Sequence, residues 1–219
     1  MSKLILIRHG QSLWNLENKF AGWKDIDLSD NGIKEAINAG KLINKSNIEF
    51  DIAYTSVLKR AIKTLWYILD EINQHWIPVY KTFELNERHY GGLTGLNKIE
   101  TAKIHGDDKV FQWRRSFNIR PPESSEEFHN SLIQERKYAD NILIPKTESL
   151  KDTSIRINPF LNNTLIPKLN LNNNTLCGYE FKQEHYHNIG IKIPASRLFE
   201  EKLFILFKIW FSHNFIKKL

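Results

Sequence analysis

Short apolar runs alternate with segments of helical periodicity in the N-terminal part of the chain, and this alternation restricts the fold more than any other feature. Apolar runs of strand length occur at residues 3–7, 50–54 and 77–81, and the first has the continuous pattern of a strand covered on both faces. Between these runs, Ser29 is a candidate cap for one amphipathic helix and Ser56 for a second. The apolar residues at helical spacing are Ile33, Ala36, Ile37, Gly40 and Ile43 in the first helix, and Leu58, Ala61, Ile62, Leu65, Ile68, Leu69 and Ile72 in the second. The alternation predicts an α/β fold, with a mainly parallel sheet and helices on both faces.

The remainder of the chain has a weaker pattern. Residues 120–147 are rich in charge and proline without a clear core face, which predicts an excursion over the surface. Residues 148–169 look helical up to their prolines. A chain of 219 residues, 41% of them hydrophobic, suits one compact domain.

Cysteine usage and apolar run lengths bear on the compartment. The single cysteine, Cys177, excludes an intramolecular disulfide and indicates an intracellular protein. No apolar run approaches the roughly 20 residues that a membrane helix needs, and the N-terminal run is too short for a signal peptide. We therefore expect a cytoplasmic protein with no membrane partner.

Positive charge gathers near one expected strand end. The formal net charge of +6 favours an anionic partner, but the basic and aromatic interleaving of nucleic-acid surfaces is missing. Ligands of parallel sheets bind at the carboxyl ends of the strands, where Arg8 and His9 would lie. Arg60 falls in the first turn of the second helix, and Arg114 and Arg115 form a pair. Each arginine alone is equally consistent with a solvated surface charge, but together they predict a phosphate pocket around a histidine.

A second chemistry-bearing stretch is "LNERHYGGLTGLNK" at residues 85–98. Its glycines leave little side chain for a core, so it predicts a substrate rim. Glu87 is the candidate general acid and base of this rim. Without this stretch, His9 would be equally well explained as a structural histidine.

Six segments in order carry a resemblance to a known family. They are "LIRHGQSLWN", "FAGWKDIDLSDNG", "YTSVLKRAIKT", "LNERHYGGLTGLNK", "WRRSF" followed by Pro121-Pro122, and "ESLKDT". The chain resembles the cofactor-dependent phosphoglycerate mutases of the histidine phosphatase superfamily, in their short bacterial form. The resemblance runs from residue 3 to about residue 176.

The resemblance implies an activity and roles for the matching residues. His9 would be the nucleophile that becomes phosphohistidine, primed by 2,3-bisphosphoglycerate, during interconversion of 3- and 2-phosphoglycerate. Arg8 and Arg60 would hold the transferring phosphoryl group, and Glu87 would handle the proton of the substrate hydroxyl. The positions implied to bind small phosphorylated three-carbon acids are Ser12, Asn15, Ala21, Gly22, Arg88, Tyr90, Lys98, Arg114 and Arg115.

Three further expectations follow from the resemblance. No metal is implied, because arginines and a second histidine do the work that Mg²⁺ does in other phosphoryl-transfer enzymes. A homo-oligomer is implied, formed through the early helices and strands. Ala21 stands where the family usually has a threonine that contacts substrate, and losing one neutral hydrogen bond costs about 1 kcal/mol.

The resemblance breaks off near residue 177. The family carries a second essential histidine in an Ala-His-Gly-Asn-Ser segment, but here "NNNTL" is followed by "CGYEFKQEHYHNIG". Counting places the missing histidine near Glu180, whose carboxylate would repel a phosphoryl group. His185 and His187 are the nearby histidines, and we expect them to be exposed loop residues rather than substitutes. The chain thus divides into a mutase-like domain, 1–176, and a diverged segment, 177–219, with the pattern of a frameshift or internal deletion.

Three functions remain open from the sequence. The first is a phosphoglycerate mutase impaired by the missing histidine. The second is a histidine-type phosphatase on the same scaffold, against which the segment 85–98 and the paired arginines count. The third is a catalytically inactive relative, or the product of a decayed gene.

Overall fold

The computed structural model describes residues 4–138, 143–170 and 175–178, in which four parallel strands form one sheet. The order across the sheet is β1-β4-β2-β3. The strands are β1 (Leu4–Ile7), β2 (Ile52–Thr55), β3 (Val79–Lys81) and β4 (Thr175–Gly178). The last strand lies between the first two, pairing in parallel with both. The expected α/β fold with a parallel sheet is confirmed.

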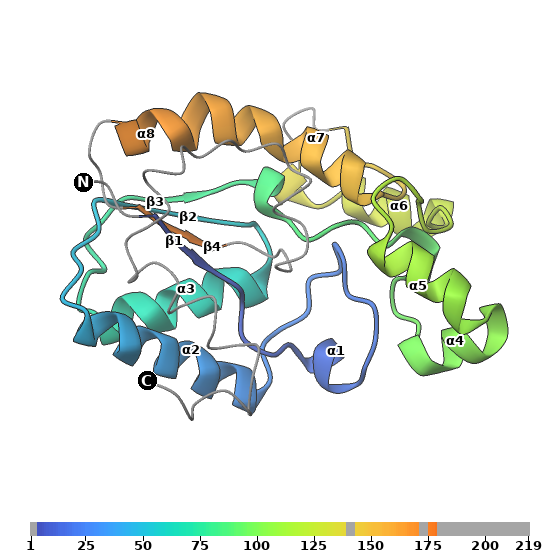
Figure 1. The fold of residues 1–219 in the computed structure, drawn as a ribbon, viewed down its shortest axis with the longest axis horizontal. Coiled ribbons are helices and arrows are strands. Elements are labelled where there is room, and N and C mark those ends of the chain that lie inside the picture. The colour runs from blue at the N-terminus through green and yellow to red at the C-terminus, as the bar shows by residue number, and fades with distance from the viewer. Residues whose placement is uncertain (1–3, 139–142, 171–174, 179–219) are drawn as a thin grey trace.

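Helices cover both faces of this sheet (Figure 1). One face carries α2 (Asp30–Lys45) and α3 (Lys59–Glu71). The other carries α7 (Leu150–Phe160), a π-helical segment (Leu161–Leu165) and α8 (Ile166–Asn170). Each face has its own apolar cluster, one built around Ile5, Ala53 and Ile68, and the other around Ile52, Tyr54 and Ile157.

The two expected helix caps had different outcomes. Ser29 is the N-cap of α2, and its hydroxyl accepts the Gly32 N–H, as predicted. Ser56 is not the cap of α3. The N-cap is Leu58, which has no capping side chain, and the Ser56 hydroxyl accepts the Leu58 N–H at 3.2 Å instead. A remote carboxylate serves instead: the Lys59 N–H donates to Asp25 at 2.7 Å. The sequence could not reveal a cap that comes from another segment.

The expectation that residues 120–147 have no core face was wrong. This segment contains α6 (Glu126–Ile133) and a 3₁₀ turn (Arg136–Tyr138). Leu132, Tyr138 and Ile144 are buried in a cluster around Trp23. Trp23 and Tyr138 stack with their ring centroids 5.2 Å apart. The core face is sparse in sequence because residues from other segments, Trp23, Val57 and Phe83, complete the cluster.

The helix over residues 148–169 continues past its prolines. Ser149 caps α7 in a capping box with Asp152, and Pro159 lies inside the helix. The π-helical segment begins two residues later and leads directly into α8. The loss of a backbone donor at a proline is absorbed by this local change of helix type rather than by a break.

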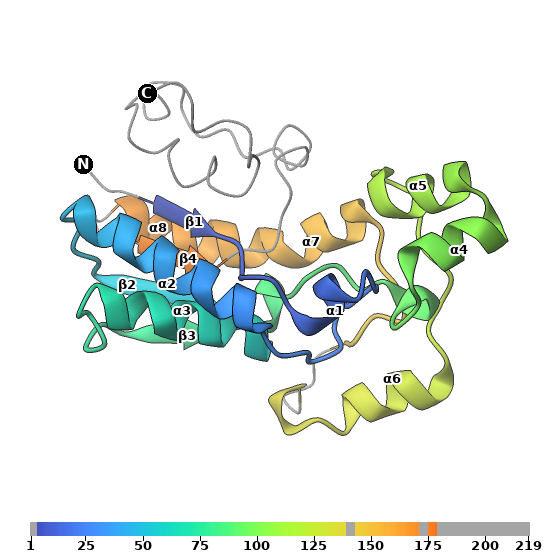
Figure 2. The same cartoon turned by 90° about the horizontal axis from the view of Figure 1, so that it is seen from below.

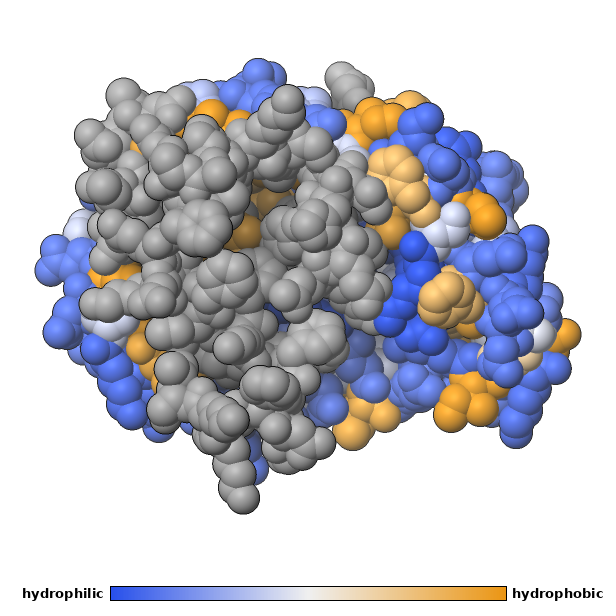
Figure 3. All heavy atoms as spheres, in the orientation of Figure 1, coloured by the Kyte–Doolittle hydropathy of each residue, from blue (hydrophilic) through white to orange (hydrophobic). Residues whose placement is uncertain are grey.

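Four helices lie beyond the carboxyl ends of the strands. They are α1 (Leu13–Leu16), α4 (Lys98–His105), α5 (Asp107–Arg115) and α6, grouped on one side of the sheet in Figure 2. A third cluster there joins Phe20, Leu93, Val110 and Trp113. The glycine-rich stretch therefore contributes core residues, Leu93 here and Leu85 against α7, contrary to the expectation that it would build little core. In Figure 3 the surface over α4 and α5 is mainly hydrophilic. Ile104 of α4 and Phe111 of α5 are exposed apolar residues.

The expected boundary near residue 176 falls within β4, and the diverged segment lies outside the described residues except for its first two positions. None of the helices in the described ranges is both long and apolar enough to span a membrane.

Candidate functional site

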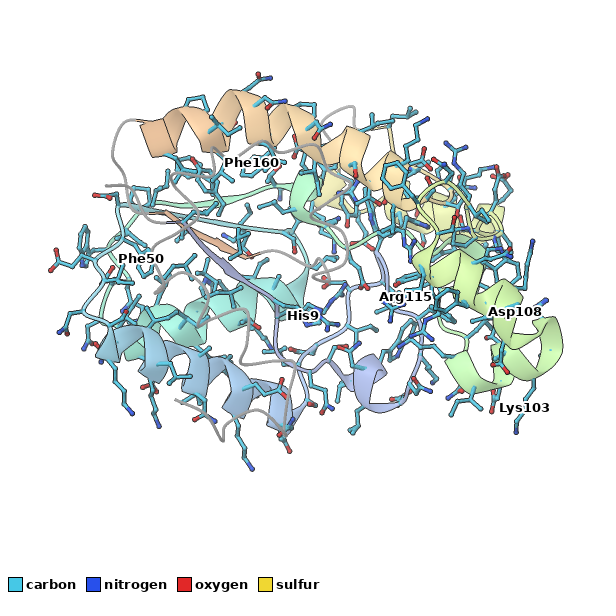
Figure 4. The ribbon with its side chains drawn as sticks, viewed as in Figure 1. His9, Phe50, Lys103, Asp108, Arg115 and Phe160 are labelled. Carbon is cyan, nitrogen blue, oxygen red and sulfur yellow. The ribbon has the colours of Figure 1, made fainter. Side chains whose placement is uncertain are left out.

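His9 lies just past the end of β1, at the carboxyl edge of the sheet (Figure 4). The Gly10 N–H donates to the Thr64 hydroxyl of α3 at 3.1 Å, which ties this strand exit to the helix. Gly10 has no room for a side chain, since a Cβ there would lie 2.1 Å from the Gly32 carbonyl oxygen. The histidine is 6% exposed. Close contacts of Gly10 with Gly32 in α2 and Thr64 in α3 thus fix the backbone next to His9.

The ring of His9 is held as one tautomer. Nδ1 lies 2.6 Å from the Gly10 carbonyl oxygen, which can only accept, so Nδ1 carries the proton and Nε2 the lone pair. Burial lowers the pKa of His9 well below its usual value, and the charges of Arg60 and Arg8 lower it further, against a smaller opposite effect of the Gly10 carbonyl. The imidazole is therefore neutral near pH 7 and has the form that a nucleophile needs.

Arg60 is fully buried in the first turn of α3. Its Nη2 donates to the Gly22 carbonyl at 2.8 Å and to the Glu87 carboxylate at 3.0 Å, and its Nη1 donates to the Lys24 carbonyl at 3.1 Å. Gly22 has a positive φ of 54° and packs tightly on the backbone of residues 88–90. These contacts hold the guanidinium in one orientation beside His9.

Glu87 is the carboxylate of this cluster, with a side chain 20% exposed. Its backbone carbonyl accepts the Trp23 indole N–H at 2.8 Å. Its charge opposes the lowering of the Lys98 pKa, which places Glu87 close to that ammonium as well. The carboxylate therefore lies between the cation beside His9 and a second group of cations.

The second group of cations comes from residues 88–98 and from α5. Arg88 is buried, its Nη2 donates to the Arg114 carbonyl at 2.8 Å, and its guanidinium lies 4.9 Å from the centre of the Tyr90 ring. Its Nε and Nη1 find no hydrogen-bond partner among the described residues. Buried donors without partners are costly, and a bound anion is the natural partner for a guanidinium.

Mutual repulsion marks these cations as one cluster. Burial lowers the pKa of Lys98, and the charges of Arg114 and Arg8 lower it further. Burial also lowers the pKa of Arg114, and Arg115 and Arg88 add to this. Figure 4 shows Arg115 at the end of α5 nearer to His9, whereas Lys103 and Asp108 lie at the far end of this helical pair. The structure thus brings together the predicted cations from four separate segments.

The remaining predicted residues, Ser12, Asn15 and Ala21, lie at or shortly after α1. Ser12 and Asn15 form the capping box of α1, in which each side chain accepts the backbone N–H of the other at 3.1 Å. Ala21 is buried, and its carbonyl accepts the Lys24 N–H in a turn. Contacts of these residues with a substrate stay predictions.

The position expected for the second histidine lies outside the described residues, as do Glu180, His185 and His187. Strand β4, which lies between β1 and β2, ends at Gly178, two residues before position 180 in the sequence.

Sequence reasoning missed a buried ion pair behind the site. Arg156 and Glu148 join at 2.7 Å, and Arg156 also donates to the Glu87 carbonyl at 3.3 Å. The spacing gave no signal, because Glu148 precedes the N-cap Ser149 of α7 and a separation of eight residues is not a contact spacing on a helix. Nothing in the sequence indicated which segment this pair would contact.

Metal ligands were not expected at this site. Across residues 4–138, 143–170 and 175–178, no three His, Cys, Asp or Glu side chains are grouped closely enough to hold a metal ion.

Solved structures share the fold at low sequence identity. A phosphoglycerate mutase from Bacillus anthracis str. Sterne matches with a TM-score of 0.58 and 21% identity, covering 81% of this chain and 74% of that one. A mycobacterial glucosyl-3-phosphoglycerate phosphatase matches with a TM-score of 0.60 and 20% identity, covering 82% and 76%. At such identities the likeness concerns the fold alone.

Sequence comparison identifies the family more closely than comparison with solved structures does. Residues 4–142 match the histidine phosphatase superfamily (branch 1). The 2,3-bisphosphoglycerate-dependent phosphoglycerate mutase 2 of Lactiplantibacillus plantarum is 54% identical over 172 residues, covering 77% of this chain and 74% of the relative. The 2,3-bisphosphoglycerate-dependent phosphoglycerate mutase of Baumannia cicadellinicola is also 54% identical over 172 residues, covering 78% and 73%. The chain belongs to the histidine phosphatase superfamily and, within it, to the family of 2,3-bisphosphoglycerate-dependent phosphoglycerate mutases.

Proposed function

We propose that the chain transfers phosphoryl groups among phosphoglycerates through a phosphohistidine at His9, as a phosphoglycerate mutase of glycolysis and gluconeogenesis with impaired turnover. The observation that carries this proposal is the buried, neutral His9 beside Arg8 and Arg60, with the Glu87 carboxylate 3.0 Å from the Arg60 guanidinium. Phosphoryl transfer needs charge neutralisation and positioning more than new covalent chemistry, and this cluster supplies both.

The residues have distinct tasks in this reaction. Nε2 of His9 carries the lone pair and attacks phosphorus, while Arg8 and Arg60 offset the charge on the phosphoryl oxygens. The bond from phosphorus to the departing oxygen breaks, and Glu87 gives that oxygen its proton. In the reverse transfer Glu87 takes the proton back from the accepting hydroxyl.

The cations around Arg88 fit a substrate with a carboxylate and a second phosphate. Within the described part of the chain, two buried donors of Arg88 have no partner. Burial, and then repulsion within the group, lowers the pKa of Lys98 and Arg114. An anion bound among Arg88, Lys98, Arg114 and Arg115 would relieve that repulsion. These residues also suit 2,3-bisphosphoglycerate, which when bound supplies the phosphoryl group that primes His9.

Impairment follows from the sequence. The chain contains no His-Gly-Asn segment, so no second histidine is present in its family context. Removing one donor that stabilises the developing charge lowers rates by about 10²–10³. We therefore assign residues 1–176 to a mutase-like domain and residues 177–219 to a segment that does not supply this group.

An inactive relative, or the product of a decayed gene, is the second candidate. It is favoured by the abrupt loss of the family pattern after Leu176. Reading codons 176–191 in the other two frames tests it: a His-Gly-Asn-Ser segment in one frame supports a frameshift, and its absence from both excludes one. A histidine-type phosphatase on the same scaffold is the third candidate, distinguished by release of inorganic phosphate instead of transfer.

The proposal also includes a cytoplasmic location and association of the chain with a second copy of itself. Large apolar side chains are exposed on α3, on β3 and between them: Trp66 at 54%, Trp76 at 73% and Tyr80 at 54%. Because β3 is an edge strand of the described sheet, this side suits contact with a second copy of the chain. Light scattering of the purified protein measures its mass in solution, and a monomer at all concentrations would contradict this part.

The decisive experiment is labelling of His9. Purified protein is incubated with 2,3-bisphosphoglycerate labelled in its phosphates, and acid-labile, base-stable label on the protein is quantified. We expect label on the wild type and on His75→Gln, a control at an exposed histidine, but none on His9→Gln. Absence of label on the wild type contradicts the proposal. Mutase turnover matching that of an intact relative would contradict the impairment.

A further inference from the structure

Arg156 of α7 reaches the segment that carries Glu87. Its Nη1 donates to the carbonyls of Phe83 and Glu84 at 3.0 and 2.9 Å. Its Nη2 donates to the carbonyls of Asn86 and Glu87 at 3.2 and 3.3 Å. One guanidinium thus holds four of the five carbonyls in residues 83–87.

Glu148, the ion-pair partner of Arg156, binds the same segment at its C-terminal end. Glu148 accepts from Nε at 2.7 Å and from Nη2 at 2.9 Å, and both side chains are nearly buried, at 9% and 3% exposure. The same carboxylate accepts the His89 backbone N–H at 2.8 Å. Glu87 and Arg88 therefore lie between two held points of the backbone. Arg156 binds carbonyls of residues 83–87, and Glu148 binds the N–H of His89.

Trp23 completes this support. Its indole N–H donates to the Glu87 carbonyl, which therefore has two donors, and the Arg156 guanidinium lies 5.3 Å from the indole ring centre. All three nitrogens of Arg156 are engaged inside the protein. The guanidinium is oriented toward backbone, so it acts on the site through the segment it holds.

We propose that Arg156, paired with Glu148, is a positioning residue that sets the placement of the Glu87 carboxylate for proton transfer. This rests on the proposed function. Residues 83–90 contain one 3₁₀ turn, Phe83–Leu85, and are otherwise irregular, so little regular structure fixes this backbone. A planar fork can contact four carbonyls at once, which a lysine ammonium cannot. A shift of about 1 Å in a catalytic group costs on the order of 10²-fold in rate.

The test is the variant Arg156→Lys, which keeps the charge and removes the fork. We expect the saturating rate constant for His9 labelling by 2,3-bisphosphoglycerate to fall about 10²-fold. The half-saturating concentration should rise by a smaller factor: Arg88 lies in the segment that Arg156 holds, but the other three proposed binding residues, Lys98, Arg114 and Arg115, lie outside it on α4 and α5. Arg120→Lys is the matched control, since Arg120 also forms a two-pronged pair with a carboxylate at the start of α7, Asp152, but at an exposed site.

A double-mutant cycle separates positioning from general damage. If Arg156 acts through Glu87, Arg156→Lys has little effect on the labelling rate in a Glu87→Gln background. An unchanged labelling rate in Arg156→Lys overturns the inference, and so does a loss of equal size in both backgrounds. Should Arg156→Lys fail to fold, Glu148→Gln takes its place in the same cycle.

Amide hydrogen exchange keeps this inference separate from the proposed function. We expect faster exchange in peptides covering residues 83–90 in Arg156→Lys and no change there in Arg120→Lys. If wild-type His9 takes no label but exchange responds in this way, the proposed function fails and the structural role of Arg156 stands. If exchange in residues 83–90 is the same in both variants, the inference is overturned.

Discussion

The Arg60 guanidinium lies 3.0 Å from the Glu87 carboxylate while its other hydrogen bonds hold the carbonyls of Gly22 and Lys24. One fully buried side chain therefore joins the turn at residues 22–24 to Glu87, the proposed acid–base residue. Arg60 also lowers the pKa of His9, so the same charge favours the neutral nucleophile.

The first prediction concerns Arg60→Lys. A lysine retains the charge but cannot donate to two carbonyls and a carboxylate in fixed directions. We expect His9 labelling to slow by about 10²-fold. The free energy of unfolding should fall by about 1–3 kcal/mol, because buried carbonyls lose a donor. Labelling kinetics and urea titrations measure the two effects, with Lys59→Met at the exposed neighbouring position as control. Normal labelling in Arg60→Lys would show that the fork is dispensable.

The second prediction concerns the backbone at the nucleophile. In Gly10→Ala the new Cβ would lie 2.1 Å from the Gly32 carbonyl oxygen, so β1 and α2 must separate locally. Overpacking of this kind costs about 1–3 kcal/mol, and we expect the labelling rate to fall because His9 is adjacent. Gly106→Ala is the comparison: its Cβ meets nothing within 4 Å, although φ is 83°. Its stability should fall through backbone strain while its labelling rate is unchanged. Equal labelling rates in the two variants would refute the argument from crowding.

The third prediction concerns acid stability and His89. This histidine is fully buried, and its Nδ1 accepts the Gly91 N–H at 3.0 Å. Burial lowers the pKa of His89 to about 3, with smaller effects from Arg156 and His129. Below its unfolded pKa of about 6.5, the unfolded chain binds a proton that the folded chain does not. The stability that His89 contributes is therefore complete above that pKa and is lost as the pH falls toward 3.

Urea titrations at pH 7 and pH 5 measure this effect. For the wild type, His89 should account for about 2 kcal/mol of the stability lost between these two pH values. His89→Gln retains an acceptor for the Gly91 N–H and has no titrating ring, so its loss should be smaller by that amount. The same pH dependence in both proteins would mean that His89 does not stay neutral in the folded state.

The sequence predicted those parts of the molecule that local pattern determines. The alternation of apolar runs and helical periodicity predicted β1, α2, β2, α3 and β3, and the Arg-His-Gly motif marked the carboxyl edge of the sheet. The insertion of β4 between β1 and β2 could not be predicted, because strand order depends on contacts between residues far apart in sequence. The same holds for the Asp25 cap of α3 and for the cluster around Trp23.

In the site too, some residues could be predicted from local sequence pattern and others could not. The side chains expected to touch substrate carry chemistry that is visible in short motifs. Arg156 and Glu148 instead hold backbone atoms that lie between 59 and 73 residues away in the sequence. Backbone acceptors carry no sequence signature. Positioning residues are therefore found only once the fold is known.

The last prediction concerns the missing histidine. Counting along the sequence places the family's second histidine near Glu180, two residues after the end of β4. A carboxylate at position 180 would disfavour a phosphoryl group on His9, whereas a histidine could donate to it. We expect Glu180→His to raise mutase turnover by about 10²-fold, if this position alone limits the reaction. Glu180→Gln, which removes only the negative charge, should give a smaller gain. Turnover of Glu180→His that is no higher than that of Glu180→Gln would show that the defect extends beyond this one side chain, to the helix that follows the histidine in the family.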